Sequence, residues 1–249
     1  MIKRFTVLVL LALGLASALL LAQQTPSVAA YDFGSRMLQR GMKGDDVREL
    51  QIRVAGWAAD STQQTYIEID GDFGPSTEAA VKRFQQAYGL TADGIVGSQT
   101  WQVLNSLEES DGSTAHFDWQ EFRGCGVSDF SGGKVGENEV KENVRRLMWK
   151  LEALRKKAGD KPVTITPKGG FRNNACNSGA GGKTNSMHLY GVAADIKISG
   201  KTPEQVRSIA KSCGFSGVAF YASFVHVDSR MEYPSYGSHY WWWPSDMQK

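Results

Sequence analysis

The segment Ser186-Met-His188-Leu-Tyr-Gly191-Val-Ala-Ala-Asp195-Ile-Lys-Ile198 decides the fold of the C-terminal half, because it runs from a glycine-containing turn into a short apolar strand. Short runs of similar β-rich composition predict three more strands, at 163–166, 217–221 and 224–228. Each run is bounded by polar or glycine-containing sequence. The C-terminal half therefore contains the strands of a small sheet.

Two helices are predicted in the same half. At 137–158, apolar residues recur at three- and four-residue spacing and the pattern stops at Gly159, as in a helix with one buried face. At 202–212, a threonine cap followed by Pro203 marks another helix start. Helices and strands are segregated rather than strictly alternating, so we predict an α+β domain over 116–249, with a small, mainly antiparallel sheet.

An internal repeat defines the preceding region. Asp70-Gly-Asp-Phe-Gly-Pro-Ser-Thr77 returns as Asp93-Gly-Ile-Val-Gly-Ser-Gln-Thr100, and each copy leads into an amphipathic stretch. Together with a similar stretch from Val47 to Val54, this predicts a bundle of three short helices over 36–107. Residues 108–115 are polar and lack apolar periodicity, so we expect a linker there.

The first thirty residues predict export. Lys3 and Arg4 precede an apolar run that ends at Ala22, and Val28-Ala-Ala30 fits a cleavage site, so 1–30 is interpreted as a signal peptide. The run is long for a signal, and an uncleaved membrane anchor stays an alternative. The net charge of +2, without a basic block or a phosphate-binding loop, argues against a nucleic-acid partner.

Three cysteines are present, and an exported chain lies where disulfides persist. Cys125 and Cys176 lie in loop-like sequence, whereas Cys213 closes a predicted helix and is typical of a small buried apolar residue. We expect a Cys125–Cys176 disulfide and one unpaired thiol.

A candidate metal site is spread over two of the predicted strands. His188 opens the turn before Asp195, and His226 lies in Phe224-Val-His226-Val-Asp228. A hydrolytic zinc site takes three protein ligands from histidine and carboxylate and leaves a position for water. Asp195 follows an apolar stretch, where a carboxylate is costly to bury without a cation. The alternative for each residue is an ordinary hydrogen-bonded or salt-bridged role.

Both halves resemble known families of bacterial wall proteins. Gly41-x-x-Gly44-x-x-Val47-x-x-Leu50-Gln51 and Asp70-Gly-x-Phe-Gly-x-x-Thr77 resemble the three-helix peptidoglycan-binding module. Gly170-Phe-Arg172, Asn185-Ser-Met-His188-Leu-Tyr-Gly-x-Ala-Ala-Asp195 and His226-Val-Asp228 resemble the zinc D-alanyl-D-alanine carboxypeptidases and their endopeptidase relatives. The resemblance implies zinc bound by His188, Asp195 and His226. It also implies a disulfide like that between Cys125 and Cys176.

Arg172 is the candidate substrate-binding residue. The resemblance gives it the task of holding a substrate carboxylate or carbonyl near the metal. Its planar guanidinium can clamp a carboxylate through two parallel hydrogen bonds, which lysine cannot do. A purely structural arginine is the alternative.

The catalytic base departs from the family pattern. Members commonly carry an acidic residue three positions before the second histidine, where Ser223 stands here, and serine cannot accept that proton at neutral pH. Asp228 is the candidate substitute, because residues two apart on a strand point to one face and place it beside His226. Equally, Asp228 can be a carboxylate that orients the histidine ligand.

The function implied is zinc-dependent hydrolysis of peptide bonds in peptidoglycan, foremost as a D-alanyl-D-alanine carboxypeptidase. A cross-link endopeptidase is one alternative, and Ser223 motivates another, a non-catalytic zinc-containing wall-binding protein. We expect Zn²⁺ as cofactor, stem peptides and cross-links of peptidoglycan as partners, a monomer, and a secreted, wall-associated location. The aromatic run Tyr240-Trp-Trp-Trp243 can pack over the sheet or line a substrate groove.

Overall fold

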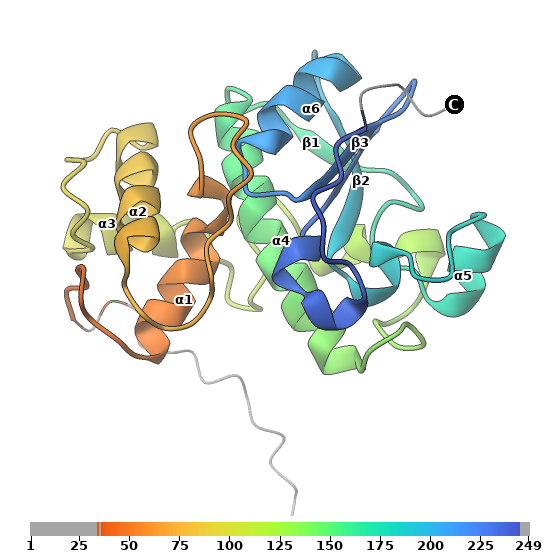
Figure 1. Ribbon diagram of the computed structural model, residues 1–249, viewed down its shortest axis with the longest axis horizontal. Helices are drawn as coiled ribbons and strands as arrows, with labels where there is room; N and C mark the ends of the chain where they lie inside the picture. Colours follow the sequence, from red (N-terminus) through yellow and green to blue (C-terminus); the bar gives the residue numbers. More distant parts are fainter. Residues whose placement is uncertain (1–33, 35, 245–249) are drawn as a thin grey trace, which may run out of the picture. The chain divides into compact units, whose positions relative to one another are not determined.

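The N-terminal module (36–107) consists of three short helices in the computed structural model, which describes residues 34 and 36–244 (Figure 1). They are α1 (Asp45–Val54), α2 (Pro75–Ala87) and α3 (Ser98–Asn105), and they confirm the three-helix prediction. The predicted signal peptide lies outside the described residues. Over the described range, no helix is both long and apolar enough to cross a membrane.

Two buried glutamines explain the internal repeat, because each braces the Asp-Gly turn that precedes the next helix. Gln51 Nε2 donates to Asp70 Oδ1 at 2.7 Å, and its Oε1 accepts from the backbone N–H of Gly71 at 2.8 Å. Gln85 makes the same two contacts in its own turn, to Asp93 (3.0 Å) and Gly94 (2.9 Å). Both amides are thus satisfied inside the fold, and the repeated residues build turns.

A four-stranded antiparallel sheet with strand order β1-β2-β4-β3 forms the centre of the C-terminal domain, which is predicted to span 116–249 and is described up to residue 244. The strands are β1 (Val163–Ile165), β2 (Ala193–Ile198), β3 (Gly217–Phe220) and β4 (Val225–Asp228). The α+β prediction is confirmed. In the β2–β4 register Asp195 lies opposite His226, so their side chains project from the same face of the sheet.

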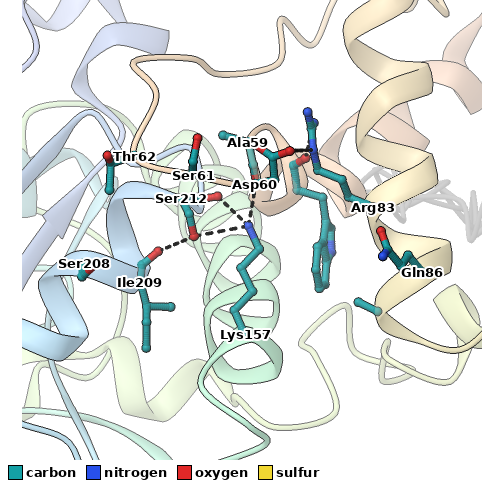
Figure 2. Close-up of a pocket in the computed structure, with 12 residues that line it drawn as sticks. Ala59, Asp60, Ser61, Thr62, Arg83, Gln86, Lys157, Ser208, Ile209 and Ser212 are labelled. Atoms are coloured by element: carbon teal, nitrogen blue, oxygen red, sulfur yellow. Dashed lines mark hydrogen bonds and ion pairs between the residues drawn. The ribbon is translucent and has the colours of Figure 1, made fainter.

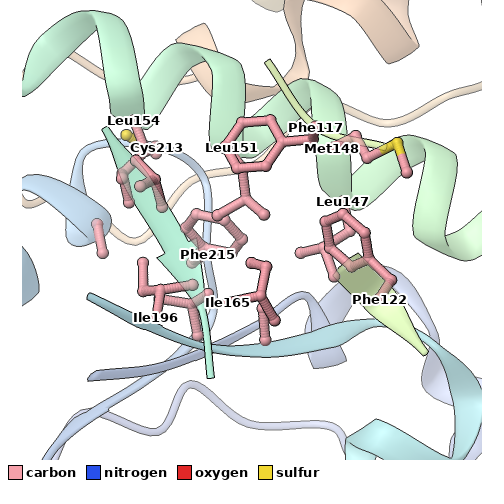
Figure 3. Close-up of a cluster of buried hydrophobic side chains, with 14 of the residues drawn as sticks. Phe117, Phe122, Leu147, Met148, Leu151, Leu154, Ile165, Ile196, Cys213 and Phe215 are labelled. Atoms are coloured by element: carbon pink, nitrogen blue, oxygen red, sulfur yellow. The ribbon is translucent and has the colours of Figure 1, made fainter. Parts of the chain in front are cut away.

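The other face of the sheet is covered by α4 (Glu137–Lys157) and α6 (Pro203–Lys211). Figure 3 shows Leu147 and Leu151 of α4 above Ile165 and Ile196 of the strands, and these side chains belong to one buried apolar cluster. Successive residues of a strand face opposite sides. Asp195, next to Ile196, is therefore directed away from this core.

The remaining helical elements are short. They are α5 (Asn174–Gly179) and the 3₁₀ helices η1 (Ala55–Trp57), η2 (Trp119–Phe122), η3 (Gly124–Gly126), η4 (Met187–Tyr190), η5 (Arg230–Glu232) and η6 (Pro234–Tyr236).

The outer face of α4 packs against the N-terminal module, so the two parts share a core. Trp149 and Ala153 of α4 belong to the buried apolar cluster of the module. A Cβ atom on Gly56 of η1 would lie 2.4 Å from the Ala153 Cβ, so only glycine permits this close approach. Arg145 adds two hydrogen bonds of 3.0 Å to the Glu49 carboxylate. All described residues fall in one compact unit.

Lys157, at the C-terminal end of α4, makes a second set of contacts between α4 and the N-terminal module (Figure 2). Its Nζ donates to the carbonyl oxygens of Ala59 at 2.8 Å and Ser212 at 2.6 Å. The ammonium also lies 5.2 Å from the Trp57 ring centroid, a distance at which cation–π attraction acts. One lysine thus joins the module, α4 and the end of α6.

The segment 108–115 is a hydrogen-bonded turn in which Thr114 bridges to Glu108 and to Phe117. Cys125 and Cys176 form a disulfide with a Cα–Cα distance of 5.9 Å, and Cys213 is a buried unpaired thiol. Cys176 lies on α5 rather than in a loop. The helix forms there because the Asn173 side chain accepts from the Cys176 backbone N–H at 2.8 Å and caps it.

Candidate metal centre

Three side chains meet on the face of the sheet opposite α4. His188 comes from η4, Asp195 from β2 and His226 from β4, and one potential ligand atom of each lies within 4.8 Å of the others. The three residues that the sequence singles out are therefore brought together. Two of them stand on hydrogen-bonded central strands, which fix their backbone positions.

His188 is held in one tautomer. Its Nδ1 lies 2.8 Å from the carbonyl oxygen of Gly170, which can only accept, so Nδ1 carries the proton and Nε2 keeps its lone pair. Nε2 is 3.2 Å from Asp195 Oδ1. Burial lowers the pKa of His188, and the imidazole is neutral near pH 7. Gly170 must be glycine, because a Cβ there would lie 2.3 Å from the Phe122 carbonyl oxygen.

His226 lies between two carboxylates. Its Nδ1 is 2.9 Å from Asp195 Oδ1, and its Nε2 is 2.9 Å from Asp228 Oδ2. Burial opposes the charged form, but the hydrogen bonds to Asp195 and Asp228 outweigh it and raise the pKa of His226 to about 9. A cation at the Nδ1 position takes the place of that proton, so metal binding and proton release are coupled.

Asp228 lies behind His226, with an exposed fraction of 0%. Arg230 grips both carboxylate oxygens, with Nε 2.9 Å from Oδ1 and Nη2 2.6 Å from Oδ2. Burial alone would raise the pKa of Asp228, but the bonds to His226 and Arg230 hold it well below the usual range. Asp228 and His226 do share one face, as the i, i+2 spacing predicts. Arg230 was not anticipated, since it lies past the strand end.

Arg172 lies beside the cluster. Its Nη2 donates to Asp195 Oδ2 at 2.6 Å, and its Nε donates to the Lys168 carbonyl oxygen at 2.5 Å. Burial alone would raise the pKa of Asp195, but the contacts with the two histidines lower it by more than burial raises it. The carboxylate is therefore ionised. Two imidazole nitrogens and one carboxylate oxygen fit the donor set of a hydrolytic zinc site. The residues present therefore suit the metal.

Known proteins share both parts of the chain. The family model described as Peptidase M15 matches residues 115–228, and a peptidoglycan binding domain model matches residues 43–104. The zinc D-Ala-D-Ala carboxypeptidase of Streptomyces albus G is 44% identical over 184 residues, which are 74% of this chain and 70% of that protein. The chain belongs to the peptidase M15 family.

Other relatives are similar over less of this M15 chain. The spore cortex-lytic enzyme of Bacillus cereus is 34% identical over 141 residues, 56% of this chain and 49% of that protein. The chain thus spans about half the length of that relative. A solved structure described as the SleB N-terminal domain is 37% identical, covers 29% of this chain and 93% of that one, and has a TM-score of 0.26. With its family and its His/Asp cluster, the chain is a zinc metallopeptidase.

The β3–β4 hairpin forms one rim of the M15 site. Ser223 is exposed in its turn, where the sequence comparison expects an acid. The Tyr221 ring stacks on the Phe224 ring, with a distance of 4.4 Å between the ring centroids. Burial and the Asp195 charge raise the pKa of Tyr221, so the phenol keeps its proton and Tyr221 is electrostatically coupled to the site.

Trp242, in the C-terminal aromatic run, forms a second rim. Trp242 pairs with Gly217 as a short parallel extension of the sheet, and its ring centroid is 6.1 Å from that of His226. Arg230 lies 4.9 Å from the Trp242 ring centroid. The aromatic composition of this run indicated either packing over the sheet or a substrate groove. The backbone pairing of Trp242 beside β3 is what brings its ring to the M15 site.

Proposed function

We propose that this M15 peptidase is a D-alanyl-D-alanine carboxypeptidase that removes the terminal residue of peptidoglycan stem peptides. The position of Arg172 supports this most directly. A guanidinium 2.6 Å from the candidate ligand Asp195 lies where it can hold the free carboxylate of a peptide whose last bond faces the metal. In an enzyme that cuts internal bonds the same guanidinium would hold a backbone carbonyl, with one charge fewer to pair.

His188, Asp195 and His226 would hold the zinc. When bound, zinc polarises the scissile carbonyl as a Lewis acid and makes water acidic enough to act as a nucleophile near neutral pH. Arg172 orients the substrate through charge-assisted hydrogen bonds. Because Nε and one N–H of Nη2 already have acceptors, the remaining N–H groups on Nη1 and Nη2 would donate to the substrate.

We assign Asp228 the task of orienting His226. It accepts from Nε2 and thereby keeps the lone pair of Nδ1 directed at the cluster. Its burial and its ion pair with Arg230 make a low-pKa carboxylate, which is a poor proton acceptor. Tyr221, which keeps its proton, would donate to the oxygen that gains negative charge in the transition state.

The peptidoglycan binding domain match supports peptidoglycan as the substrate, and an enzyme acting on it works at the cell wall, outside the cell. We further propose that the chain is secreted through the segment 1–30 and works as a monomer on stem peptides and cross-links.

Mass spectrometry of defined muropeptides tests this function. We expect zinc-loaded protein to release one D-alanine from a pentapeptide stem. His226→Ala and chelated protein should release none, whereas His239→Ala, which changes an exposed histidine, should behave like the wild type. Cleavage of cross-linked dimers with intact pentapeptides would instead identify an endopeptidase. Zinc binding without any cleavage would contradict the proposal altogether.

A further inference from the structure

A cavity of about 360 Å³ opens on the N-terminal module, and none of its lining residues belongs to the metal centre. Its volume is at the lower end of the range for ligand sites. The walls come from the segment 64–68, from the Asp-Gly turn and the start of α2, and from Trp241. The C-terminal domain thus contributes one aromatic residue to a cavity of the module.

Two aromatic rings lie side by side, tilted against each other, at this cavity. The ring centroids of Tyr66 and Trp241 are 6.3 Å apart, with 41° between their planes. Neither side chain is fully buried, so each keeps ring surface for a ligand. Flat apolar faces beside hydroxyl groups suit a ligand with both an apolar face and polar edges.

The polar lining indicates which ligand is accepted. Among the described residues that line the cavity, none is lysine or arginine, whereas Glu68, Asp70 and Asp72 contribute carboxylates. Asp72 is paired with Lys43 at 2.6 Å, and the remaining negative charge of the lining disfavours phosphate and carboxylate ligands. Gln64, Thr65 and the carboxylates can exchange hydrogen bonds with hydroxyl and amide groups. Aromatic faces with such a rim fit an uncharged N-acetylated sugar.

Trp241 and Trp242 connect this cavity to the metal centre. Trp242 extends the sheet beside β3 through backbone hydrogen bonds to Ser216 and Val218, each 2.8 Å. Because side chains alternate along an extended segment, neighbouring tryptophans point to opposite sides. Trp242 contacts His226, and Trp241 lines the cavity with Tyr66.

We propose that Tyr66 and Trp241 form a binding subsite for the N-acetylated amino-sugar strand of peptidoglycan, fixed relative to the metal by the Trp241–Trp242 segment. The second half of this proposal rests on the proposed function, since it places a stem peptide at the metal while its glycan occupies the cavity. The sugar subsite itself stands on the cavity and its rings.

The larger cavity beside Lys157, about 580 Å³, fits such a ligand less well (Figure 2). Lys157 already donates to the carbonyl oxygens of Ala59 and Ser212. The Arg83 side chain likewise donates to the carbonyl oxygen of Trp57 at 3.2 Å. Lys157 therefore holds the module and the C-terminal domain together, and Arg83 is engaged within the module.

Calorimetry of the zinc-loaded full chain with an oligomer of β-1,4-linked N-acetylglucosamine tests the subsite. We expect Trp241→Ala and Tyr66→Ala each to weaken binding about tenfold, which corresponds to about 1.4 kcal/mol. Trp241→Phe keeps a flat ring and should retain most of the affinity. Unchanged affinity in both alanine variants, or equal loss in Trp241→Phe and Trp241→Ala, would overturn the subsite.

Kinetics separate positioning from general damage near His226. On glycan-bearing pentapeptide, Trp241→Ala should raise KM about tenfold with kcat unchanged, while kinetics on the sugar-free pentapeptide stay at wild-type values. Equal losses on both substrates would overturn the link between the two sites. If the wild-type protein cuts neither substrate, and both alanine variants lose the sugar binding that the wild type shows, the subsite stands and the proposed peptidase function fails.

Discussion

Replacing Asp228 with asparagine separates the two roles that a carboxylate can play beside His226. Asp228 Oδ2 accepts from His226 Nε2 at 2.9 Å and from Arg230 Nη2 at 2.6 Å. An asparagine amide in that place presents N–H groups to both partners. His226 Nε2 must then accept, and the imidazole proton moves to Nδ1, the atom that faces Asp195. A protonated Nδ1 cannot bind a metal.

The expected loss follows from these contacts. Restoring the metal-binding tautomer leaves His226 Nε2–H facing the amide N–H in a buried site, a mismatch that costs about 1–3 kcal/mol. Flipping the amide only moves the mismatch to the backbone N–H of Arg230, which now donates to Asp228 Oδ1 at 3.1 Å. Zinc affinity should therefore fall about 10- to 100-fold, the range for lost partners of histidine ligands.

Competition with a zinc chelator measures the affinity, and D-alanine release at saturating zinc measures kcat. We expect Asp228→Asn to recover most of the wild-type kcat once zinc is saturating, with Asp45→Asn as a charge-matched control on the exposed first turn of α1. Unchanged zinc affinity together with a kcat loss of about 10²- to 10⁴-fold would refute the orienting role and identify Asp228 as the base.

Other perturbations test the seam and the substrate clamp. Gly56→Ala should destabilise the chain by about 1–3 kcal/mol of overpacking and lower Tm by about 2–12 °C, because its Cβ would lie 2.4 Å from that of Ala153. Adding Ala153→Gly should recover only part of Tm, since the Lys150 backbone stays close and glycine inside a helix costs about 1 kcal/mol. A fully stable single variant would contradict the packing. Arg172→Lys should lower kcat/KM about 10- to 100-fold while zinc content stays intact, since lysine cannot replace two charge-assisted hydrogen bonds; loss of zinc would instead indicate a structural arginine. Burial alone would raise the pKa of Glu49, but Arg145 and Arg53 outweigh burial and lower that pKa. The ion pairs of Glu49 therefore stabilise the folded chain above about pH 4.3, and this stabilisation is lost as acid protonates the carboxylate. Thermal melts should show that Glu49→Gln costs more stability at pH 7 than at pH 3; an equal difference at both pH values would argue against this ion pair.

The fold could be predicted where one pattern governs one surface. The spacing of apolar residues on α4 marks the face that packs on the sheet, and β-rich runs mark all four strands. The packing of Trp149 could not be predicted, because its neighbours lie in the module, far earlier in the sequence. Periodicity carries no information about such a distant partner. Cys176 looked like a loop residue, since a six-residue helix is too short to give a periodic signal.

The site could be predicted as a set of residues but not as a network. Histidine and aspartate on neighbouring strands indicated the cluster, and the i, i+2 spacing indicated that Asp228 faces His226. The sequence could not decide whether Asp228 accepts protons or holds the imidazole. That choice depends on Arg230, whose guanidinium returns to Asp228 from η5, and on burial, which only the folded chain defines.

The packing of Trp149 and Ala153 against the module changes how the enzyme can search its substrate. With a flexible linker, every peptide bond within the length of the linker would be equally accessible to the metal centre. Because the module is fixed to α4, one binding event presents only those stem peptides that project from the glycan strand at one distance and one angle. The spacing of the cuts would then record the helical repeat of the glycan strand.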